Sequence, residues 1–257
     1  MKTILITGCS SGFGLETARY FLERGDWNVI ATMRTAQEDV LPRSDRLRVL
    51  ALDVTKPESI RKAVEAAGPI DVLANNAGIG VLGAFEATPM QTVRDVFETN
   101  TFGLMALTQA VLPQFRQRKA GVVVNVTSSV TMAPLTLLAA YTASKAAVEA
   151  FTECLALELR GFDVRVSLVQ PGLGPGTQFG ANARPRMDGL VPEAYASLAQ
   201  AVFAGMAKPS AITHPLDVAQ AVWRAANDAA GPLRIPAGAD AVALAAEVAQ
   251  RHSHSAP

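Results

Sequence analysis

Two side chains at the start of a helix-like segment could act together in proton transfer. Tyr141 and Lys145 lie four residues apart, so their side chains share one face of that helix. Tyrosine and lysine both serve as general acids and bases, although a chance spacing with a solvated lysine is the plain alternative. Ser128 and Ser129 follow the apolar residues 122–126, at the carboxyl end of a predicted strand. An open α/β sheet places its ligands at that end, and this context favours a reactive site.

A glycine-rich turn near the start of the chain is suited to holding a phosphate group. It joins a predicted first strand to a predicted helix, and its candidate binding residues are Gly8, Ser10, Ser11, Gly12, Phe13 and Gly14. Such a turn lets the backbone approach a pyrophosphate, and the helix N-terminus adds free N–H groups and a favourable dipole. The alternative is a tight turn that needs glycine only for its backbone angles. The spacing Gly-x-x-x-Gly-x-Gly differs from the usual Gly-x-Gly-x-x-Gly, but the position at the first strand–helix junction favours a dinucleotide.

The end of the second predicted strand bears on which nicotinamide cofactor binds. NAD sites usually have an acidic residue about 20 positions beyond the glycine turn, where a carboxylate repels the 2′-phosphate of NADP. This chain instead has Arg34, whose planar, permanently charged fork suits a phosphate. We therefore favour NADP(H). NAD(H) stays open, because Arg34 could be an ordinary surface arginine while Glu38 or Asp39 folds back to bind the ribose.

Taken in order along the chain, these motifs resemble the short-chain dehydrogenases/reductases, in particular the hydroxysteroid dehydrogenase and carbonyl reductase type. The resemblance runs from Lys2 to about Gly172. It rests on the glycine turn, Asp53-Val54, Asn75-Asn76-Ala77-Gly78, Asn100, Ser128, Tyr141-x-x-x-Lys145 and Pro171-Gly172. The family's catalytic serine lies thirteen positions before its tyrosine, which selects Ser128 over Ser129. The fold implied is a single-domain, Rossmann-like α/β fold, with a doubly wound, seven-stranded parallel sheet and helices on both faces.

The resemblance implies four catalytic roles. Tyr141 is the acid/base that exchanges a proton with the substrate oxygen. Lys145, together with the oxidised nicotinamide, lowers the pKa of that phenol from about 10 and binds the nicotinamide ribose. Ser128 donates a hydrogen bond to the substrate oxygen. Asn100 holds a water that links Lys145 to solvent, although for Asn100 alone a satisfied polar group in a long helix is the alternative.

The resemblance also assigns contacts to the cofactor. From the adenine ring to the nicotinamide, the residues expected along it are Asp53, Val54, Asn76, Ala77, Gly78, Pro171 and Gly172. The family usually places a threonine four residues after that last glycine, where this chain has Gly176. Thr177 lies one residue late, so it takes the role only if the turn bulges by one residue.

Short apolar runs alternate with helix-like stretches, which is the pattern of repeated βαβ units around a parallel sheet. Strands are expected at residues 3–7, 28–32, 47–52, 70–74, 122–126, 164–169 and 233–235. Helices are expected at residues 12–24, 57–67, 89–119, 141–160, 192–206, 215–230 and 239–251. Residues 171–190, rich in glycine and proline, break this rhythm. We therefore expect one domain over residues 1–257, with a substrate loop or lid within residues 171–214.

Bulk composition narrows the class of partner. Basic and acidic side chains are equally numerous, so no strong field favours nucleic acid or an acidic membrane. The two cysteines lack metal or redox spacing and the three histidines come late in the chain, so no metal site is expected. The first residues hold no signal-peptide core or membrane span, and we expect a cytoplasmic protein.

The residues expected around the substrate are mostly apolar: Met132, Leu135, Leu137, Leu138, Phe179, Met187 and Leu190. They favour an apolar ketone or secondary alcohol, although such residues are more often plain packing. The leading hypothesis is an NADP(H)-dependent oxidoreductase that interconverts a ketone or aldehyde and an alcohol. The resemblance implies a homodimer or homotetramer through residues 89–119 and 141–160. The alternatives are an NAD(P)-binding regulatory protein with little turnover and an NAD-dependent dehydrogenase of the hydroxysteroid or retinol type.

Overall fold

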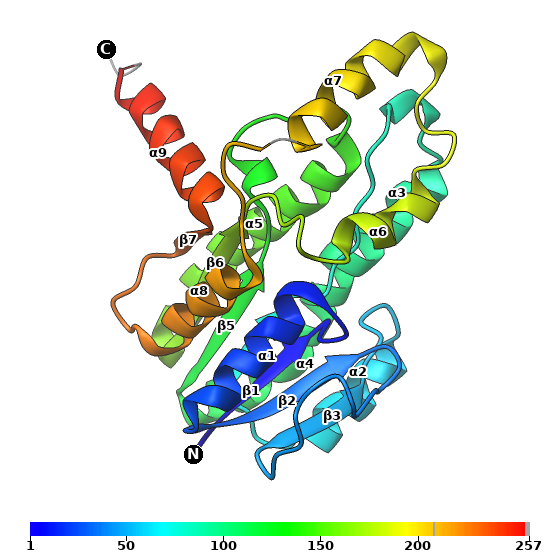
Figure 1. Ribbon diagram of the computed structural model, residues 1–257. Helices are drawn as coiled ribbons and strands as arrows, with labels where there is room; N and C mark the ends of the chain where they lie inside the picture. The colour runs from blue at the N-terminus through cyan, green and yellow to red at the C-terminus, as the bar shows by residue number, and fades with distance from the viewer. Residues whose placement is uncertain (208, 255–257) are drawn as a thin grey trace.

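The computed structural model describes residues 1–207 and 209–254 and is built around one parallel sheet (Figure 1). Over these residues, seven strands lie in the order β3-β2-β1-β4-β5-β6-β7, and the order reverses between β1 and β4. The strands are β1 (Lys2–Thr7), β2 (Trp27–Met33), β3 (Leu47–Ala51), β4 (Val72–Asn75), β5 (Gly121–Val126), β6 (Val164–Pro171) and β7 (Arg234–Ala237). The predicted doubly wound sheet is confirmed, and its switch point lies at the carboxyl ends of β1 and β4.

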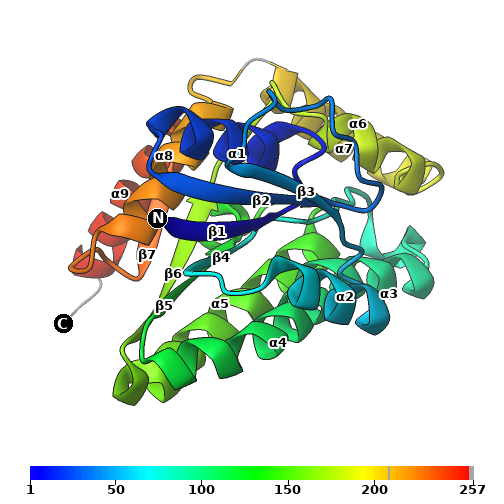
Figure 2. The same ribbon diagram turned by 90° about the horizontal axis from the view of Figure 1, so that it is seen from below.

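Helices cover both faces of the sheet, as predicted (Figure 2). Helices α1 and α8 pack together on one face, while α2, α4 and α5 lie on the other. The helices of the described chain are α1 (Gly12–Arg24), α2 (Pro57–Ala67), α3 (Met90–Phe97), α4 (Gly103–Arg118), α5 (Ala139–Leu159), α6 (Phe179–Ala183), α7 (Ala196–Ala207), α8 (Pro215–Asn227) and α9 (Ala239–His254). None of the described helices is long and apolar enough to cross a membrane.

An apolar core lies on each face of the sheet because side chains alternate along every strand. In β1, Ile4 and Ile6 are fully buried in the core beneath α1 and α8, whereas Leu5 is fully buried in the core beneath α2 and α4. A strand covered on both faces is apolar at nearly every position, which is the pattern that predicts these strands. Full burial of each such side chain contributes about 1.5–3 kcal/mol. The carboxyl edge of the sheet is therefore supported from both sides.

The helix predicted over residues 89–119 is not continuous. It is divided into α3, a π-helical turn over Glu98–Phe102, and α4. Within the turn, Thr101 Oγ1 donates to the Ser144 carbonyl oxygen of α5 at 2.9 Å, and Asn100 Nδ2 donates to the Ser144 hydroxyl at 3.1 Å. These bonds to a neighbouring helix hold the wider turn, and turns of this kind occur frequently at functional sites. A tertiary contact of this type leaves no periodic signal in the sequence.

The segment predicted as an irregular lid contains short helices. Helix α6 and a 3₁₀ turn, Arg184–Arg186, lie within residues 171–190. A second 3₁₀ turn, Glu193–Tyr195, precedes α7, where the sequence predicts a helix from residue 192. These pieces are too short to give a periodic signal. Other predicted ends differ by up to three residues; β4, for example, begins at Val72 and not at residue 70.

Candidate active site

The Tyr141 and Lys145 side chains lie on the buried face of α5, near the carboxyl end of β5. The exposed fraction of Lys145 is 4%, so the alternative of a solvated surface lysine is wrong. Its Nζ donates to the Val126 carbonyl oxygen at 3.0 Å and lies 6.0 Å from the centre of the Tyr141 ring. Burying an ammonium group is unfavourable, and folding alone does not require one here. The pair therefore marks a candidate site on physical grounds.

Ser128 follows β5 and meets Tyr141 across the edge of the sheet. The Ser128 hydroxyl is near enough to the phenol to lower the pKa of Tyr141 by side-chain hydrogen bonding. Ser128 Oγ also accepts the Val130 N–H at 3.4 Å, as the N-cap of a 3₁₀ turn over Ser129–Thr131. The structure thus brings Ser128, Tyr141 and Lys145 together at the sheet edge.

Burial has opposite effects on the two ionisable groups. It raises the pKa of Tyr141 from 10.0 to about 12, and the Ser128 hydrogen bond opposes this only in part. It lowers the pKa of Lys145 from 10.5 to about 8, against the attraction of the Glu149 carboxylate. The family resemblance implies a lowered Tyr141 pKa when Lys145 acts together with the oxidised nicotinamide, and that effect stays a prediction. In this structure the phenol is buried and Lys145 Nζ is directed to the Val126 carbonyl oxygen.

Asn100, in the π-helical turn, is fully buried and its amide group is saturated with hydrogen bonds. Its Oδ1 accepts the Ile79 N–H at 2.8 Å, and its Nδ2 donates to the Ile79 carbonyl oxygen at 2.9 Å and to Ser144 Oγ. Gly78 lies beside it, where a Cβ would be 3.3 Å from Asn100 Oδ1 and 3.4 Å from Lys145 Nζ. The alternative of a satisfied structural amide therefore describes this side chain, and the water relay stays a prediction.

The glycine turn after β1 is braced by the end of β4. Gly8 and Gly12 have φ values of 75° and 60°, a region that favours glycine. A Cβ at Gly14 would lie 2.4 Å from the Gly8 carbonyl oxygen, so no side chain fits there. Asn76 Nδ2 donates to the Thr7 carbonyl oxygen, and the Asn76 N–H donates to the Thr7 hydroxyl, each at 2.9 Å. Asn76 therefore fixes the shape of the turn.

The start of α1 fits a phosphate group. Ser11 occupies the N-cap position, but its hydroxyl makes no capping hydrogen bond, and the first turn of α1 carries no acidic residue. Ser10 is exposed beside it. Free N–H groups and the positive end of the helix dipole are what an anion requires. The residues present thus match the phosphate group of a dinucleotide.

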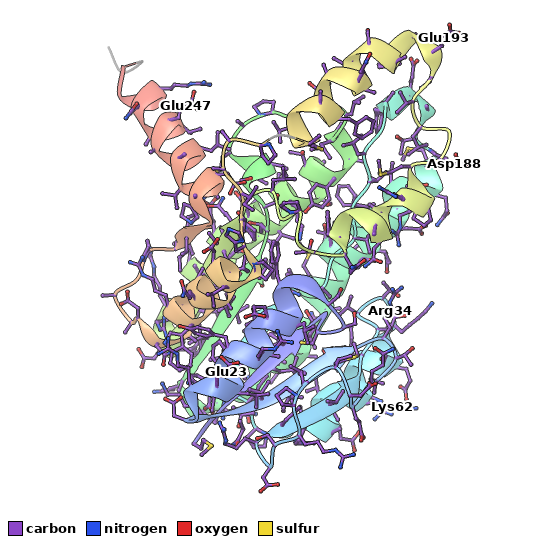
Figure 3. The ribbon with its side chains drawn as sticks, in the orientation of Figure 1. Glu23, Arg34, Lys62, Asp188, Glu193 and Glu247 are labelled. Carbon is purple, nitrogen blue, oxygen red and sulfur yellow. The ribbon has the colours of Figure 1, made fainter. Side chains whose placement is uncertain are left out.

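Arg34 follows directly after β2 and is exposed at the carboxyl end of that strand (Figure 3). Strand β2 pairs in parallel with β1, and Thr32 lies opposite Thr7 in the register. Because Thr7 leads into the glycine turn, Arg34 and the turn lie at the same edge of the sheet on adjacent strands. That is the place where a cofactor's adenosine ribose is expected.

Asp53 and Val54 have local contacts at the end of β3. Asp53 Oδ1 accepts the Thr55 N–H at 3.0 Å and the Thr55 hydroxyl at 2.8 Å. Val54 packs against the start of α4, where a Cβ at Gly103 would lie 2.8 Å from the Val54 carbonyl oxygen. Both residues therefore shape the turn into α2, in addition to their expected place near the adenine ring.

The predicted lid begins at a set of contacts that the sequence does not reveal. A Cβ at Gly172 would lie 2.1 Å from Asp240 Oδ2, so only glycine fits beside this carboxylate. The Leu173 N–H donates to Asp240 Oδ2 at 2.6 Å, and the Gly172 N–H donates to the Thr213 hydroxyl at 2.9 Å. Thr213 Oγ1 lies 2.7 Å from Asp240 Oδ1. Asp240, at the start of α9, and Thr213 are distant in sequence and carry no motif, which is why sequence reasoning missed them.

The predicted lid lies against both the glycine turn and Tyr141. A Cβ at Gly12 would be 3.2 Å from Thr177 Cβ, so Thr177 lies beside the glycine turn, and its contact with the nicotinamide stays a prediction. The Phe179 ring centre lies 5.7 Å from the Tyr141 ring centre. The same ring occupies the space beside Gly80, where a Cβ would be 2.7 Å away.

Apolar side chains from the lid meet residues 131–138 near Tyr141. Leu190 is buried in one cluster with Tyr141 and Val130, and Leu137 and Met187 pack in a neighbouring cluster. Most residues expected around the substrate therefore lie together, whereas Leu135 is 48% exposed.

Comparison with known proteins agrees with this geometry. A family model described as short chain dehydrogenase matches residues 2–188. Retinol dehydrogenase 8 of Bos taurus is 39% identical over 184 residues, which cover 66% of this chain and 58% of that protein. A 3-ketodihydrosphingosine reductase of Bacteroides thetaiotaomicron is 42% identical over 175 residues, which cover 66% of this chain and 63% of that protein. The chain thus spans less than two thirds of the length of these relatives.

Solved structures of short-chain dehydrogenases are similar to this chain over almost its whole length. A short-chain dehydrogenase from Streptomyces avermitilis has a TM-score of 0.81 at 33% identity and covers 98% of this chain and 94% of its own. A serine dehydrogenase complexed with NADP⁺ has a TM-score of 0.77 at 28% identity, covering 92% and 94%. A short chain dehydrogenase/reductase from Burkholderia phymatum in complex with NAD has a TM-score of 0.79 at 25% identity, covering 98% and 93%. This chain belongs to the short-chain dehydrogenase family.

Proposed function

We propose that this chain is an NADP(H)-dependent oxidoreductase that interconverts a ketone or aldehyde and the corresponding alcohol. The observation that carries the proposal is the buried Tyr141 phenol, which lies beside the buried Ser128 hydroxyl and one helical turn from the buried Lys145. The relatives are named as a dehydrogenase and a reductase, which supports this class of reaction. A cytoplasmic location stays a prediction.

In the reductive direction, Ser128 donates a hydrogen bond to the carbonyl oxygen and Tyr141 transfers its phenolic proton to that oxygen. A nicotinamide held beside Tyr141 and Lys145 would supply the hydride for reduction of the carbonyl carbon and would accept it in the reverse direction. The Lys145 ammonium stabilises the phenolate left behind, which regains a proton from solvent before the next turnover. The burial of both side chains strengthens their attraction, because the effective dielectric constant is low.

Contacts at the glycine turn and the end of β2 support the choice of cofactor. The uncapped start of α1 would hold the pyrophosphate, and Gly78, Pro171 and Gly172 would lie along the nicotinamide half. Arg34 is exposed at the strand end where NAD-preferring sites carry a carboxylate. Its guanidinium group would bind the 2′-phosphate of NADP(H). The similar solved structures hold NADP⁺ in one protein and NAD in another, so NAD(H) stays the second choice.

The apolar wall beside Tyr141 supports an apolar ketone or secondary alcohol as substrate. Leu190, Leu137 and Phe179 contribute to it, and the polar groups that converge there are the Ser128 and Tyr141 hydroxyls. A site with apolar walls and few polar groups binds an apolar molecule and orients one oxygen of it. Retinol and ketodihydrosphingosine, which the names of the relatives contain, have this chemistry.

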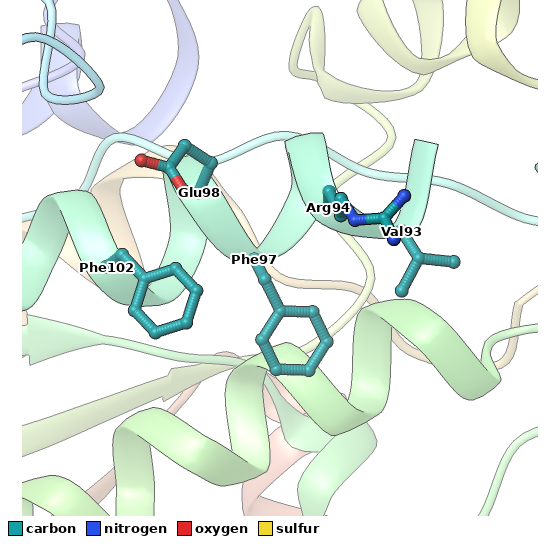
Figure 4. Close-up of a pocket in the computed structure, with 5 residues that line it drawn as sticks. All are labelled: Val93, Arg94, Phe97, Glu98 and Phe102. Atoms are coloured by element: carbon teal, nitrogen blue, oxygen red, sulfur yellow. The ribbon is translucent and has the colours of Figure 1, made fainter. Parts of the chain in front are cut away.

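We also propose that the chain forms a homodimer or homotetramer through the face that includes α4 and α5. A shallow pocket in this region is lined by Val93, Arg94, Phe97, Glu98 and Phe102 (Figure 4). Phe102 is 55% exposed, and its ring centre lies 6.5 Å from that of Phe97. An apolar patch that carries one basic and one acidic side chain can be complementary to itself about a twofold axis.

A spectrophotometric assay of apolar ketones, aldehydes and secondary alcohols, run with each nicotinamide cofactor, tests the reaction. The Tyr141→Phe variant should bind NADPH as the wild type does and lose about 10²–10⁴-fold in turnover, because it lacks the proton donor. Unchanged turnover would overturn the role of Tyr141. If the wild type binds NADPH but oxidises it with no carbonyl compound, the regulatory nucleotide-binding alternative replaces the proposed function.

A further inference from the structure

Glu149 is a buried carboxylate on α5, one helical turn after Lys145, and the roles proposed above do not include it. Its exposed fraction is 8%. One oxygen, Oε1, accepts hydrogen bonds from Gln170 Nε2 at 2.8 Å, from Thr131 Oγ1 at 2.6 Å and from Thr127 Oγ1 at 3.1 Å. Tyr141, Lys145 and Glu149 are spaced by four residues, so the three side chains follow one face of α5.

The three donors belong to the segments that carry the rest of the site. Thr127 and Thr131 flank Ser128, and the Thr131 hydroxyl also lies 2.8 Å from the Ser128 carbonyl oxygen. Gln170 is the next-to-last residue of β6, directly before Pro171 and the start of the predicted lid. A single carboxylate oxygen therefore joins the catalytic helix to the Ser128 turn and to the strand that leads into the lid.

A charged group is not needed for these hydrogen bonds to form, because a neutral amide oxygen also accepts them, although more weakly. A buried carboxylate is unfavourable unless it is paired. Arg234 of β7 lies 3.7 Å from the other oxygen, Glu149 Oε2, and it also forms an ion pair with Glu153 one turn further along α5. Among the residues described, the ionisable groups around Lys145 are thus Tyr141 and Glu149, with Arg234 and Glu153 behind Glu149.

We propose that Glu149 is a positioning residue whose negative charge keeps Lys145 in its cationic form and whose Oε1 fixes the Ser128 turn to the catalytic helix. The proposal rests on the proposed function, since it assigns how the proton donor of that reaction is maintained. This role requires the negative charge of Glu149, whereas a purely structural role would require only a buried polar side chain of the same shape.

The direction of the effect follows from the groups involved. Burial lowers the pKa of Lys145 to about 8, and the Glu149 charge opposes that decrease. Removal of the charge therefore lowers the Lys145 pKa further, and the ammonium loses its proton at a lower pH. Since carbonyl reduction needs a protonated Tyr141 beside a cationic Lys145, the basic side of the activity profile should move to lower pH.

The first test is the pH profile of kcat for carbonyl reduction in Glu149→Gln. The amide retains an acceptor for the Thr127, Thr131 and Gln170 side chains, and the basic limb should move down by about one pH unit. Glu153→Gln is the matched control, because it makes the same change one turn later on α5 and touches the same Arg234. Its profile should coincide with that of the wild type. A Glu149→Gln profile that also coincides overturns the proposal.

A second measurement does not depend on turnover. In the full chain labelled with ¹³C-lysine, the Cε signal of Lys145, identified by its loss in Lys145→Arg, reports the protonation of that amine against pH. Its midpoint should fall in Glu149→Gln and stay unchanged in Glu153→Gln. If Glu149→Gln does not fold, Glu149→Asp keeps the charge and should keep the wild-type midpoint, whereas a lower midpoint in it contradicts the assignment. Absence of wild-type turnover would overturn the proposed function alone, because this titration still decides the role of Glu149.

Discussion

Tyr141 must be buried to meet a substrate away from water, and the same burial opposes its ionisation. With a pKa of about 12, the phenol stays protonated at neutral pH, which suits donation of a proton to a carbonyl oxygen. Proton acceptance from an alcohol requires the phenolate, so it requires positive charge close to the ring. Lys145 is the described residue placed to supply it, at 6.0 Å from the ring centre. The charge on Lys145 therefore matters in both directions, because it stabilises the phenolate that oxidation requires and that reduction leaves behind.

Arg34 is the residue on which cofactor preference is expected to depend. The Arg34→Asp variant removes the guanidinium partner of the 2′-phosphate and adds a repelling carboxylate. Loss of a charge-assisted hydrogen bond of about 1.5–3 kcal/mol predicts a rise in the NADPH Michaelis constant of about ten- to a hundredfold, with a smaller change for NADH. Steady-state kinetics with both cofactors measure the ratio.

A matched control for that variant is Arg43→Asp. Arg43 is exposed on the same connection between β2 and β3, and the substitution changes the net charge equally. It should leave both Michaelis constants near the wild-type values. If the NADPH Michaelis constant is unchanged in Arg34→Asp, Arg34 does not bind the 2′-phosphate. The competing arrangement is an NAD site in which Glu38 or Asp39 binds the ribose.

At the scale of elements, the end of β6 is joined to the start of α9 by a contact that explains a glycine. Gly172 leaves no room for a Cβ because Asp240 Oδ2 would be 2.1 Å away, and Asp240 also binds the Leu173 N–H. Gly172→Ala should therefore lower the free energy of unfolding by about 1–3 kcal/mol through overpacking. In the Asp240→Ala variant, the same substitution should lower the free energy of unfolding by much less.

Urea unfolding of the wild type, the two single variants and the double variant measures this coupling. Asp240→Ala alone should lower the free energy of unfolding by about 1–3 kcal/mol, because the Leu173 N–H loses its partner. Gly176→Ala is the control, since a Cβ there would have no neighbour within 4 Å. If the changes in unfolding free energy caused by Gly172→Ala and Asp240→Ala are strictly additive in the double variant, the Asp240 carboxylate is not what excludes a side chain at position 172.

The elements that are easy to predict are those with a strong period. Strand β1 is apolar on both faces because both are covered, so Ile4, Leu5 and Ile6 reveal it directly. The π-helical turn at Asn100 cannot be predicted in this way, because bonds to Ser144 on another helix produce it. Likewise, motif order indicates Ser128, whereas Glu149 has only a helical spacing of four residues to mark it.

The lid shows a second limit of sequence reasoning. Glycine and proline mark residues 171–190 as irregular, but they do not show where its side chains lie. The Phe179 and Tyr141 rings lie 5.7 Å apart. This contact between α6 and α5 arises from tertiary packing, which no sequence pattern records. The lid's apolar residues indicate an apolar pocket, and only the fold shows that Leu190 shares a cluster with Tyr141.

At the scale of the whole molecule, apolar surface is not spread evenly. Phe102, directly before α4, is 55% exposed beside the partly buried Phe97. An exposed aromatic ring at a helix surface favours burial against another protein surface. The α1 and α8 face has an exposed apolar residue too, Leu216, but it lies at the start of α8 in a different surface region.

These two exposed side chains allow a paired test of self-association. Phe102→Asp places a carboxylate in the apolar patch near Glu98, so a dimer through this face should dissociate, with the dissociation constant raised by about tenfold or more. Leu216→Asp makes the same kind of change on the opposite face of the sheet and should leave the assembly intact. Sedimentation velocity over a range of protein concentrations distinguishes the species. A wild type that sediments as a monomer would rule out this face as the interface, and so would a Phe102→Asp variant that associates as the wild type does. Because the proposed active-site residues lie at the sheet edge, Phe102→Asp should leave them in place. Turnover by a monomeric Phe102→Asp variant would then show that the site is complete within one chain.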